Sequence, residues 1–362
     1  MAKTPTKKRV KVDIALQGGG SHGAFTWGVL DRLLEEPWIE VRGVSGTSAG
    51  AMNAVALVQG LAQDGPDQVK SLLKSFWLRV SQAAAFSPLQ RTMMDRMTGG
   101  WRLDQSPIYA WTEAFSSFFS PYDFNPLGIN AMRPIVKDTF DFDAINSRAA
   151  PKLFQSATNV RSGRLKLFKQ PKISVDTTLA SACLPSIYQA IEIDGEAYWD
   201  GGYMGNPPLF PLVRDSEAKD LILIQINPFR REDIPKSSGD INNRLNEIIF
   251  NSSVLHELRA AGIMYSWLKE EQVQLKGLGT GRLHRIEAES VMRELNVSSK
   301  MNAAPDFIDY LFQVGRDTAD AWIGTHASDV GVKTTWIPDI IEDYLDDDDD
   351  VTMSSKPKRA QG

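Results

Sequence analysis

Two glycine-containing turns, each placed between an expected strand and an expected helix, constrain this chain more than any other feature of its sequence. Residues 10–16 have the apolar content of a strand, three glycines follow, and residues 24–36 have the apolar spacing of an amphipathic helix. The pattern then repeats, with a short strand over 39–44 and a helix over 49–61. Strands and helices that alternate through tight turns favour a parallel sheet with helical layers, so we expect an α/β fold.

The remaining elements extend this pattern along the 362 residues. Strands are predicted over 152–158, 165–168 and 221–226, a hairpin over 191–199 with its turn at Asp194-Gly195, a short helix over 178–182, and long helices over 242–268 and 305–323. Residues 64–127 instead show helical spacing and almost no strand character. We expect them to form a helical insertion, of the kind that can cover a site.

The charge and the cysteine content exclude several classes of function. The formal net charge of −5 equals the charge of one aspartate run, residues 346–350, so no global positive field favours nucleic acid. Cys183 is the only cysteine, which rules out an intrachain disulfide. The four histidines lack zinc-ligand spacing, so no metal is expected. Neither a secretory signal nor a membrane-spanning segment is recognised, and we expect a cytoplasmic protein, free or peripheral to a membrane or lipid surface.

The first turn is Gly18-Gly19-Gly20-Ser21-His22-Gly23. Its amides lie at a helix N-terminus, where they can bind either a phosphate or the oxyanion of an acyl-transfer intermediate. The segment also matches the Gly-x-Gly-x-x-Gly dinucleotide fingerprint. The acidic residue that this fingerprint needs about twenty positions later is missing from Val41-Arg42-Gly43-Val44-Ser45. A glycine turn used only for packing is the third interpretation.

The second turn, Gly46-Thr47-Ser48-Ala49-Gly50, has the sequence and the position of a nucleophile elbow. The flanking glycines allow a tight turn that projects the Ser48 hydroxyl above a helix N-terminus. The alternative is that Ser48 or Thr47 only caps the helix. The carboxyl ends of successive parallel strands share one edge of the sheet. A nucleophile at this turn and an oxyanion site at the first turn would therefore be neighbours.

A serine nucleophile needs a base, and Asp200 is the best candidate. It ends a hairpin strand in Trp199-Asp200-Gly201-Gly202, where a carboxylate reaches a sheet edge. Its alternative role is a turn aspartate that bonds its own backbone. An α/β-hydrolase would use a histidine downstream of the serine. His256, His284 and His326, however, stand in periodic or charged segments that are typical of surface or core histidines.

Together these motifs resemble the signature of the patatin-like phospholipase family. The signature has three parts in order: a glycine-rich oxyanion loop, Gly-x-Ser-x-Gly and Asp-Gly-Gly, which here are Gly18 to Gly23, Gly46 to Gly50, and Asp200 to Gly202. Residues 180–185 and Asn206-Pro207-Pro208 are also similar to family segments. The likeness extends over residues 11–228 and is weaker in the insertion and at the C-terminus. Any single motif is common, whereas three in this order are specific.

The resemblance implies a three-layer α/β/α patatin-like fold with a mainly parallel central sheet. It also implies a Ser-Asp dyad that works without histidine, metal or cofactor. Ser48 would attack an ester carbonyl, and Asp200 would accept its proton and later activate water. The amides of Gly18, Gly19 and Gly20 would stabilise the oxyanion. The other motif glycines would shape the turns: Gly23, Gly46, Gly50, Gly201 and Gly202.

One residue, His22, departs from the family pattern, which usually has Arg or Lys at this position. A histidine there is expected to be only partly charged near neutral pH. The oxyanion loop would then lack a fixed positive charge, and activity would depend on pH.

The implied substrate and partner is a lipid ester, hydrolysed as by a phospholipase A or a lipid acyl hydrolase. Two alternatives stay open: an esterase or polyhydroxyalkanoate-type depolymerase with the same dyad, and a non-catalytic protein that binds nucleotide or lipid through Gly18 to Gly23. Apolar residues in the insertion would line an acyl-chain groove, meet a membrane interface or only pack on the body: Trp101, Ile108, Trp111, Phe115, Phe118 and Phe119.

These considerations divide the chain into four parts. We expect a flexible basic N-terminus over 1–10, one patatin-like hydrolase domain over 11–325, a C-terminal extension over 326–345, and a disordered tail over 346–362 that is acidic and then basic. The hydrolase domain would include the insertion and the C-terminal helices over 241–325.

Overall fold

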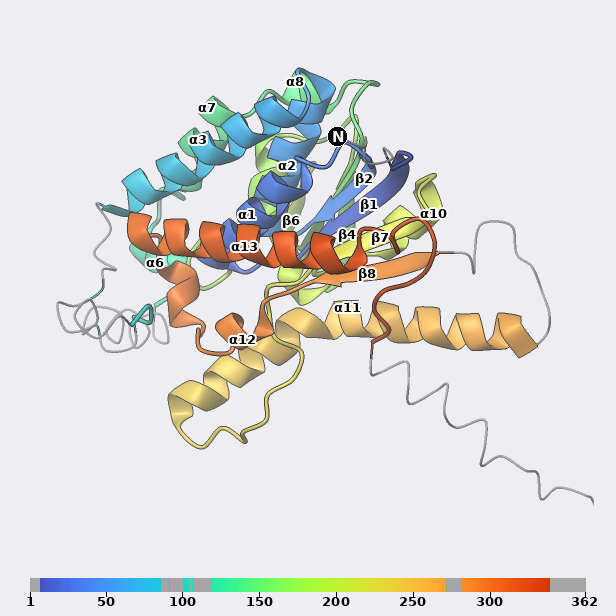
Figure 1. The fold of residues 1–362 in the computed structure, drawn as a ribbon. Coiled ribbons are helices and arrows are strands. Elements are labelled where there is room, and N and C mark those ends of the chain that lie inside the picture. The colour runs from blue at the N-terminus through green and yellow to red at the C-terminus, as the bar shows by residue number, and fades with distance from the viewer. Residues whose placement is uncertain are drawn as a thin grey trace, which may run out of the picture.

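The computed structural model describes residues 7–85, 91, 100–103, 106, 119–270 and 281–338. Its centre is a mixed sheet of eight strands in the order β5-β6-β3-β2-β1-β7-β8, with β4 paired to β3 outside this order (Figure 1). The strands are β1 (Val10–Leu16), β2 (Ile39–Gly46), β3 (Lys152–Asn159), β4 (Leu165–Lys169), β5 (Ile191–Ile193), β6 (Glu196–Asp200), β7 (Asp220–Ile224) and β8 (Arg282–Ile286). Strands β3, β2, β1, β7 and β8, which are neighbours in this order, are parallel. The pairs that involve β4, β5 and β6 are antiparallel.

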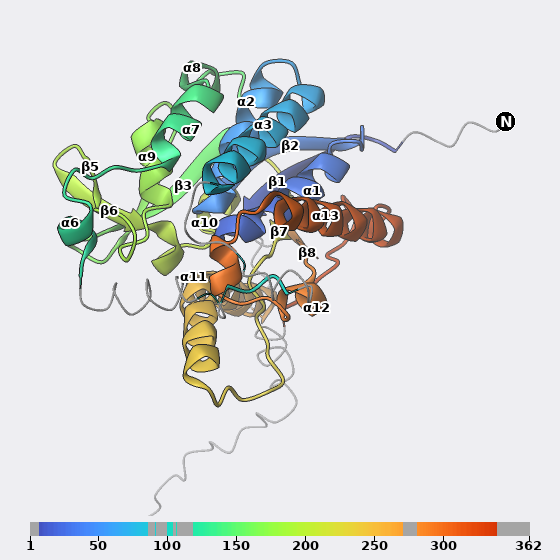
Figure 2. The same ribbon diagram turned by 90° about the vertical axis from the view of Figure 1, so that its left-hand side faces the viewer.

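Helices cover both faces of this sheet (Figures 1 and 2). They are α1 (Gly23–Leu33), α2 (Ala49–Ala62), α3 (Pro66–Ala85), α6 (Pro121–Phe124), α7 (Met132–Thr139), α8 (Phe142–Ile145), α9 (Val175–Ser181), α10 (Phe210–Asp215), α11 (Ser238–Glu270), α12 (Glu289–Met292) and α13 (Pro305–His326). Three short 3-10 helices join them: η1 (Gly20–His22), η2 (Gly201–Tyr203) and η3 (Ser298–Met301). Helices α1, α2, α3 and α13 pack over one face, and α10 and α11 over the other.

The alternation of side chains along β1 explains why there are two hydrophobic cores. Ile14 and Leu16 point into the larger cluster, beneath α1, α2 and α13. Ala15 points to the opposite face and packs in a smaller cluster with Leu223 of β7 and with residues of α10 and α11. A sheet buried on both faces is the usual setting of parallel strands. The expected three-layer α/β/α fold is confirmed.

Most elements begin and end near their expected residues, and the exceptions have physical causes. Helix α9 starts at Val175 rather than at 178, because Ser174 and Thr177 form a capping box one turn earlier. Strand β8 was not expected, because Arg282 and His284 make it look charged. In the fold both side chains bond to Asp220 on the neighbouring strand. A strand that carries charges can therefore be buried when its partner strand supplies the counter-charge.

The expected insertion is only partly described. Residues 66–85 of it form α3, as the spacing predicted. Trp101 packs against α13, with ring centroids 5.1 Å from both Phe307 and Tyr310, so it packs on the body. Phe119 is half exposed. Four of the apolar residues singled out from the sequence lie outside the described residues: Ile108, Trp111, Phe115 and Phe118.

No helix within the described residues combines the length and the apolar character that are needed to cross a membrane.

Candidate active site

Ser48 occupies the junction between β2 and α2 in a backbone conformation that side chains rarely adopt. Its φ is 54° and its ψ is −123°, and such a strained position is typical of nucleophile elbows. The helix packs so closely behind it that a side chain at Gly50 would collide with the Leu16 carbonyl oxygen. Ser48 stands at the N-cap position of α2, but its side chain makes no capping hydrogen bond. The helix-cap alternative is therefore wrong.

The glycine turn after β1 lies directly against Ser48. A Cβ atom at Gly18 would lie 2.8 Å from the Ser48 Cβ atom, which is closer than real atoms approach. The Ser48 N–H is fixed on the other side, where it donates to Ser181 Oγ at 3.0 Å. The two motifs that were predicted to be neighbours at one edge of the sheet are thus brought together.

Asp200 reaches the same place through strand register. Gly46 on β2 pairs with Gln155 on β3, and Ala157 on β3 pairs with Asp200 on β6. Ser48 lies two residues beyond Gly46, so the serine and the aspartate stand level with Ala157 on either side of β3. The antiparallel β5–β6 hairpin turns at Asp194 and Gly195, both with positive φ, and so returns Asp200 to this edge.

The Asp200 carboxyl group is fully buried, and only one of its two oxygen atoms accepts a well-formed hydrogen bond. Its Oδ1 atom accepts the Gly202 N–H at 2.7 Å, which is the turn contact considered as its alternative role. Its Oδ2 atom has no hydrogen-bond partner of good geometry among the described residues. Burial raises the pKa of Asp200 to about 7, although the Gly202 amide, the nearby Ser48 hydroxyl and Lys300 each act to lower it. Asp200 therefore holds an unpaired oxygen beside Ser48 and titrates near neutral pH.

The amides of the glycine turn are not equivalent. The Gly18 N–H donates to Asn206 Oδ1 at 2.6 Å, and the Gly18 carbonyl accepts from Asn227 Nδ2 at 2.9 Å. Within the described part of the chain, the N–H groups of Gly19 and Gly20 have no such acceptor. Gly19 and Gly20 therefore present the amides that are free to receive a developing negative charge.

Four buried amide side chains hold this turn, and sequence reasoning did not single them out as site residues. Gln17 donates to Asn251 Oδ1 at 2.8 Å and accepts from the Asn227 N–H at 2.7 Å. Asn206 also donates to the Phe250 carbonyl at 3.0 Å. A signal was present for some of them: Gln17 and Asn227 follow the apolar runs of β1 and β7, where a polar residue faces the edge of the sheet.

The environment of His22 differs from the one expected from the sequence. It is buried, and its Nε2 atom lies 2.8 Å from Ser299 Oγ. Burial and, to a lesser degree, the charge of Lys300 lower the pKa of His22 well below its usual value. The expectation of a partly charged histidine is wrong, because the ring is neutral near pH 7.

His284 lies away from Ser48, in the core, which agrees with its interpretation as a surface or core histidine. Its ring is fully buried between Asp220 Oδ1 at 3.0 Å and Thr335 Oγ1 at 2.9 Å. Asp220 begins β7, at the end of the strand away from the glycine turns. Among the described residues, no three His, Cys, Asp or Glu side chains come together as metal ligands.

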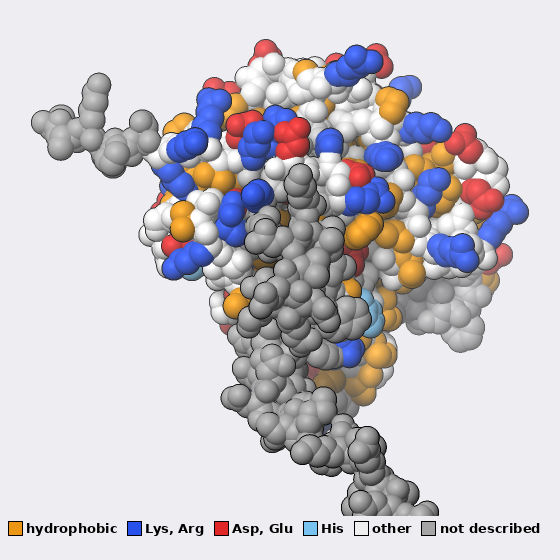
Figure 3. Space-filling view, turned by 90° about the vertical axis from the view of Figure 1, so that its right-hand side faces the viewer, with side chains coloured by type: hydrophobic (Ala, Val, Ile, Leu, Met, Phe, Trp, Pro, Cys, Tyr) orange, Lys and Arg blue, Asp and Glu red, His pale blue; other side chains and the backbone are white. Residues whose placement is uncertain are grey.

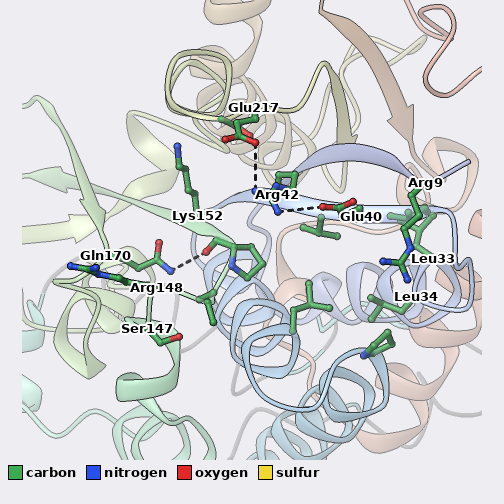
Figure 4. A pocket seen from close by; sticks show the side chains of 18 of the residues that line it. Arg9, Leu33, Leu34, Glu40, Arg42, Ser147, Arg148, Lys152, Gln170 and Glu217 are labelled. Atoms are coloured by element: carbon green, nitrogen blue, oxygen red, sulfur yellow. Dashed lines mark hydrogen bonds and ion pairs between the residues drawn. The ribbon is translucent and has the colours of Figure 1, made fainter.

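A cavity of about 970 Å³ lies at the amino-terminal edge of the sheet, opposite Ser48 (Figure 4). Its wall includes Arg42 in the first half of β2 and Lys152 at the start of β3. Arg42 is paired with Glu40 at 3.3 Å and with Glu217 at 3.5 Å. On this side of the molecule, basic side chains are scattered among acidic and apolar ones (Figure 3). Ser147 and Ser216 line this cavity, but Ser216 donates to the Asp13 carboxylate at 2.6 Å. Neither serine has the positive φ of an elbow, so Ser48 stays the candidate nucleophile.

Comparison with known proteins gives one family match and several distantly similar solved structures. Residues 14–213 match the family described as Patatin-like phospholipase. Among solved structures, VipD from Legionella pneumophila is 15% identical with a TM-score of 0.41, over 88% of this chain and 67% of that chain. The type III effector ExoU is 13% identical with a TM-score of 0.30, over 86% of this chain and 52% of that chain. ExoU in its complex with SpcU from Pseudomonas aeruginosa is 16% identical with a TM-score of 0.30, over 68% and 50%. No curated protein matches the chain.

The family match covers more than half of the chain and contains the glycine turn, the elbow and the aspartate. The resemblance seen in the sequence is thereby confirmed, and the chain belongs to the patatin-like phospholipase family.

Proposed function

We propose that this protein hydrolyses carboxylic esters of lipids, with Ser48 as the nucleophile and Asp200 as the proton acceptor. Its family consists of lipid hydrolases, which supports the class of reaction. The observation that carries the assignment of residues is the unpartnered, buried Oδ2 atom of Asp200 beside a serine on a strained elbow.

The proposed reaction has two halves. Ser48 Oγ attacks the ester carbonyl while its proton passes to Asp200, and the N–H groups of Gly19 and Gly20 stabilise the oxyanion. Collapse of this intermediate releases the alcohol, which takes the proton from Asp200, and leaves an acyl-serine. Water then attacks the acyl group and gives a proton to Asp200. Collapse of this second intermediate breaks the bond to Ser48 Oγ and releases the carboxylic acid, while the proton passes from Asp200 back to Ser48 Oγ.

The pKa of Asp200 suits this role. A general base works best when its pKa lies near the operating pH, because it is then both largely ionised and basic enough to take the proton. A pKa of about 7 meets this condition, whereas an ordinary exposed aspartate would be a much weaker base. Gly18 takes a supporting role in this scheme, since its amide already holds Asn206.

The contact with a lipid surface is proposed for α11. Ile241, Leu245, Ile248 and Ile249 follow helical spacing on this helix and are each about half exposed. The buried side of the same helix carries Asn251, which accepts a hydrogen bond from Gln17 beneath the glycine turn. An apolar stripe so connected to the site would hold the enzyme where its substrate resides.

A fluorophosphonate probe tests the assignment of the nucleophile. We expect the probe to label the wild-type protein and not Ser48→Ala, while Ser45→Ala, a matched buried serine on the same strand, stays labelled. Labelling that persists in folded Ser48→Ala would contradict the assignment. Hydrolysis rates on a phospholipid, a monoacyl ester and a hydroxyalkanoate oligomer then decide between a phospholipase, an esterase and a polyester depolymerase.

A further inference from the structure

Lys300 connects the glycine turn to the Asp200 side of the site. Its residue lies on η3, outside the segment that matches the family. The Lys300 carbonyl packs so closely against Gly20 that a side chain at Gly20 would collide with it. Its side chain crosses to α11, where Nζ donates to Asn246 Oδ1 at 2.9 Å.

The Lys300 ammonium also approaches the ring that covers Asp200. Its Nζ atom lies 5.4 Å from the centroid of the Phe250 ring. The same ring packs so tightly on Gly202 that no side chain would fit there, and the Gly202 amide bonds to Asp200. Lys300, Phe250, Gly202 and Asp200 are therefore contiguous, with no bulk water between the ring and the turn.

Of the other titratable groups that face this pair, those beside Asp200 and the glycine turn are neutral near pH 7, and the charged ones, which include Arg231, gather around Glu247 on α11. Burial raises the pKa values of Cys183 and Tyr203, which flank Asp200, to about 12, so both are neutral. His22 is neutral because its pKa is lowered. Glu247 on α11 faces Lys300, but it is paired with Arg231 at 3.0 Å and with Arg244 at 3.1 Å.

We propose that Lys300 is a positioning residue of the active site, whose ammonium keeps the buried Asp200 carboxylate ionised and ready to accept the Ser48 proton. This role rests on the proposed dyad. It also explains how the site manages with a neutral His22 where a basic residue was expected. The positive charge enters from η3 instead of from the glycine turn.

The electrostatics agree with this geometry. Burial lowers the pKa of Lys300 to about 8, opposed by the charges of Glu247 and Asp200. Burial raises the pKa of Asp200, opposed in part by Lys300. Each of the two groups therefore favours the charged form of the other, in a part of the protein that disfavours charge.

The test compares the pH dependence of kcat/KM in four proteins: wild type, Lys300→Met, Lys300→Arg and Asn246→Ala. Loss of the ammonium should move the midpoint of the acidic limb upward by about 0.5–1 pH unit, as expected for a partly screened charge at this range. Lys300→Arg keeps the charge and should keep the midpoint. Asn246→Ala removes only the hydrogen bond that orients the ammonium, and should also keep it. Lys300→Gln serves in place of Lys300→Met if the latter does not fold.

An unshifted midpoint in a folded Lys300→Met or Lys300→Gln protein, with a uniform fall in kcat/KM, would mean that Lys300 only supports the loop and would overturn this proposal alone. A shift of equal size in Asn246→Ala would also count against a role for the charge. Hydrolysis that survives in Ser48→Ala would overturn the dyad and the role of Lys300 together.

Discussion

Asp200 and Asp220 are equally buried aspartates at opposite edges of one sheet, and their environments have opposite effects. Asp220 is enclosed by donors: Arg282 at 2.6 Å, His284 at 3.0 Å and the Gly331 amide at 2.8 Å. Burial opposes the ionisation of Asp220, but these bonds outweigh it and hold its pKa below the usual range. At Asp200 the Gly202 amide, the Ser48 hydroxyl and Lys300 oppose burial less strongly, so burial prevails and raises its pKa to about 7.

The difference shows how the same residue type can be stabilised as a carboxylate at one edge and left with a raised pKa, as the proposed base requires, at the other. A carboxylate surrounded by donors is a poor base, because hydrogen bonds to its ionised form lower its pKa. A carboxylate left short of donors costs the fold some stability but can accept a proton during a reaction. Substitutions at the two positions should therefore have opposite consequences.

The largest effect is expected for Asp200→Asn. It removes the base and should lower kcat/KM by about 10³-fold or more. It should also raise the unfolding temperature at pH 8, because a raised pKa means that ionised Asp200 destabilises the folded state as the pH rises from about 4 through 7. Steady-state kinetics and thermal unfolding on the same preparation test the expected fall in kcat/KM and the expected rise in unfolding temperature. A destabilised Asp200→Asn would break the comparison.

Asp220→Asn is expected to behave in the opposite way. It leaves Arg282 and His284 without their carboxylate and should cost about 3 kcal/mol of unfolding free energy near pH 7. The folded pKa of Asp220 is depressed, so its contribution is present above the unfolded value of about 4 and is lost as the pH falls through the folded value. Urea unfolding measures the cost. The folded fraction should keep its activity, and a large fall in kcat at low temperature would contradict a purely structural role.

The pH dependence of the wild type sharpens the comparison further. Asp200 acts only when ionised, so kcat/KM should fall about tenfold for each pH unit below 7. Asp13 on β1 is a useful control, because burial also raises its pKa to about 7, but its carboxylate accepts from Ser216 at the end of α10, away from Ser48. Asp13→Asn should leave the midpoint unchanged. If it abolishes the acidic limb, that limb does not report on Asp200.

The smallest effects are expected in the glycine turn. Gly18→Ala pushes a methyl group to 2.8 Å from the Ser48 Cβ atom and should lower kcat by about tenfold or more, since misplaced catalytic groups are costly. Gly19→Ala keeps its amide, and its methyl group would lie nearest the Ile226 side chain, at 3.0 Å, so a loss of about threefold or less is expected. Kinetics at saturating substrate rank the two. Equal losses would mean that the turn does not distinguish these positions.

The sequence alone determined the features that depend on neighbouring residues. The strand and helix periods, the glycines that permit the elbow, and the Asp194-Gly195 turn act over a few positions, and each could be recognised without the fold. Ser48 and Asp200 could be proposed from the sequence because each follows or ends a recognisable strand, and the order of three motifs identified the family.

Only the tertiary structure decided the features that depend on distant partners. Asn206 takes the Gly18 amide from 188 positions away, and Ser299 meets the ring of His22 from 277 positions away. Strand β8 has a charged pattern that becomes intelligible only beside Asp220. Lys300 carried no motif at all. A pKa or a free amide is set by burial and by the groups that surround it in space, and a local pattern of residues contains neither.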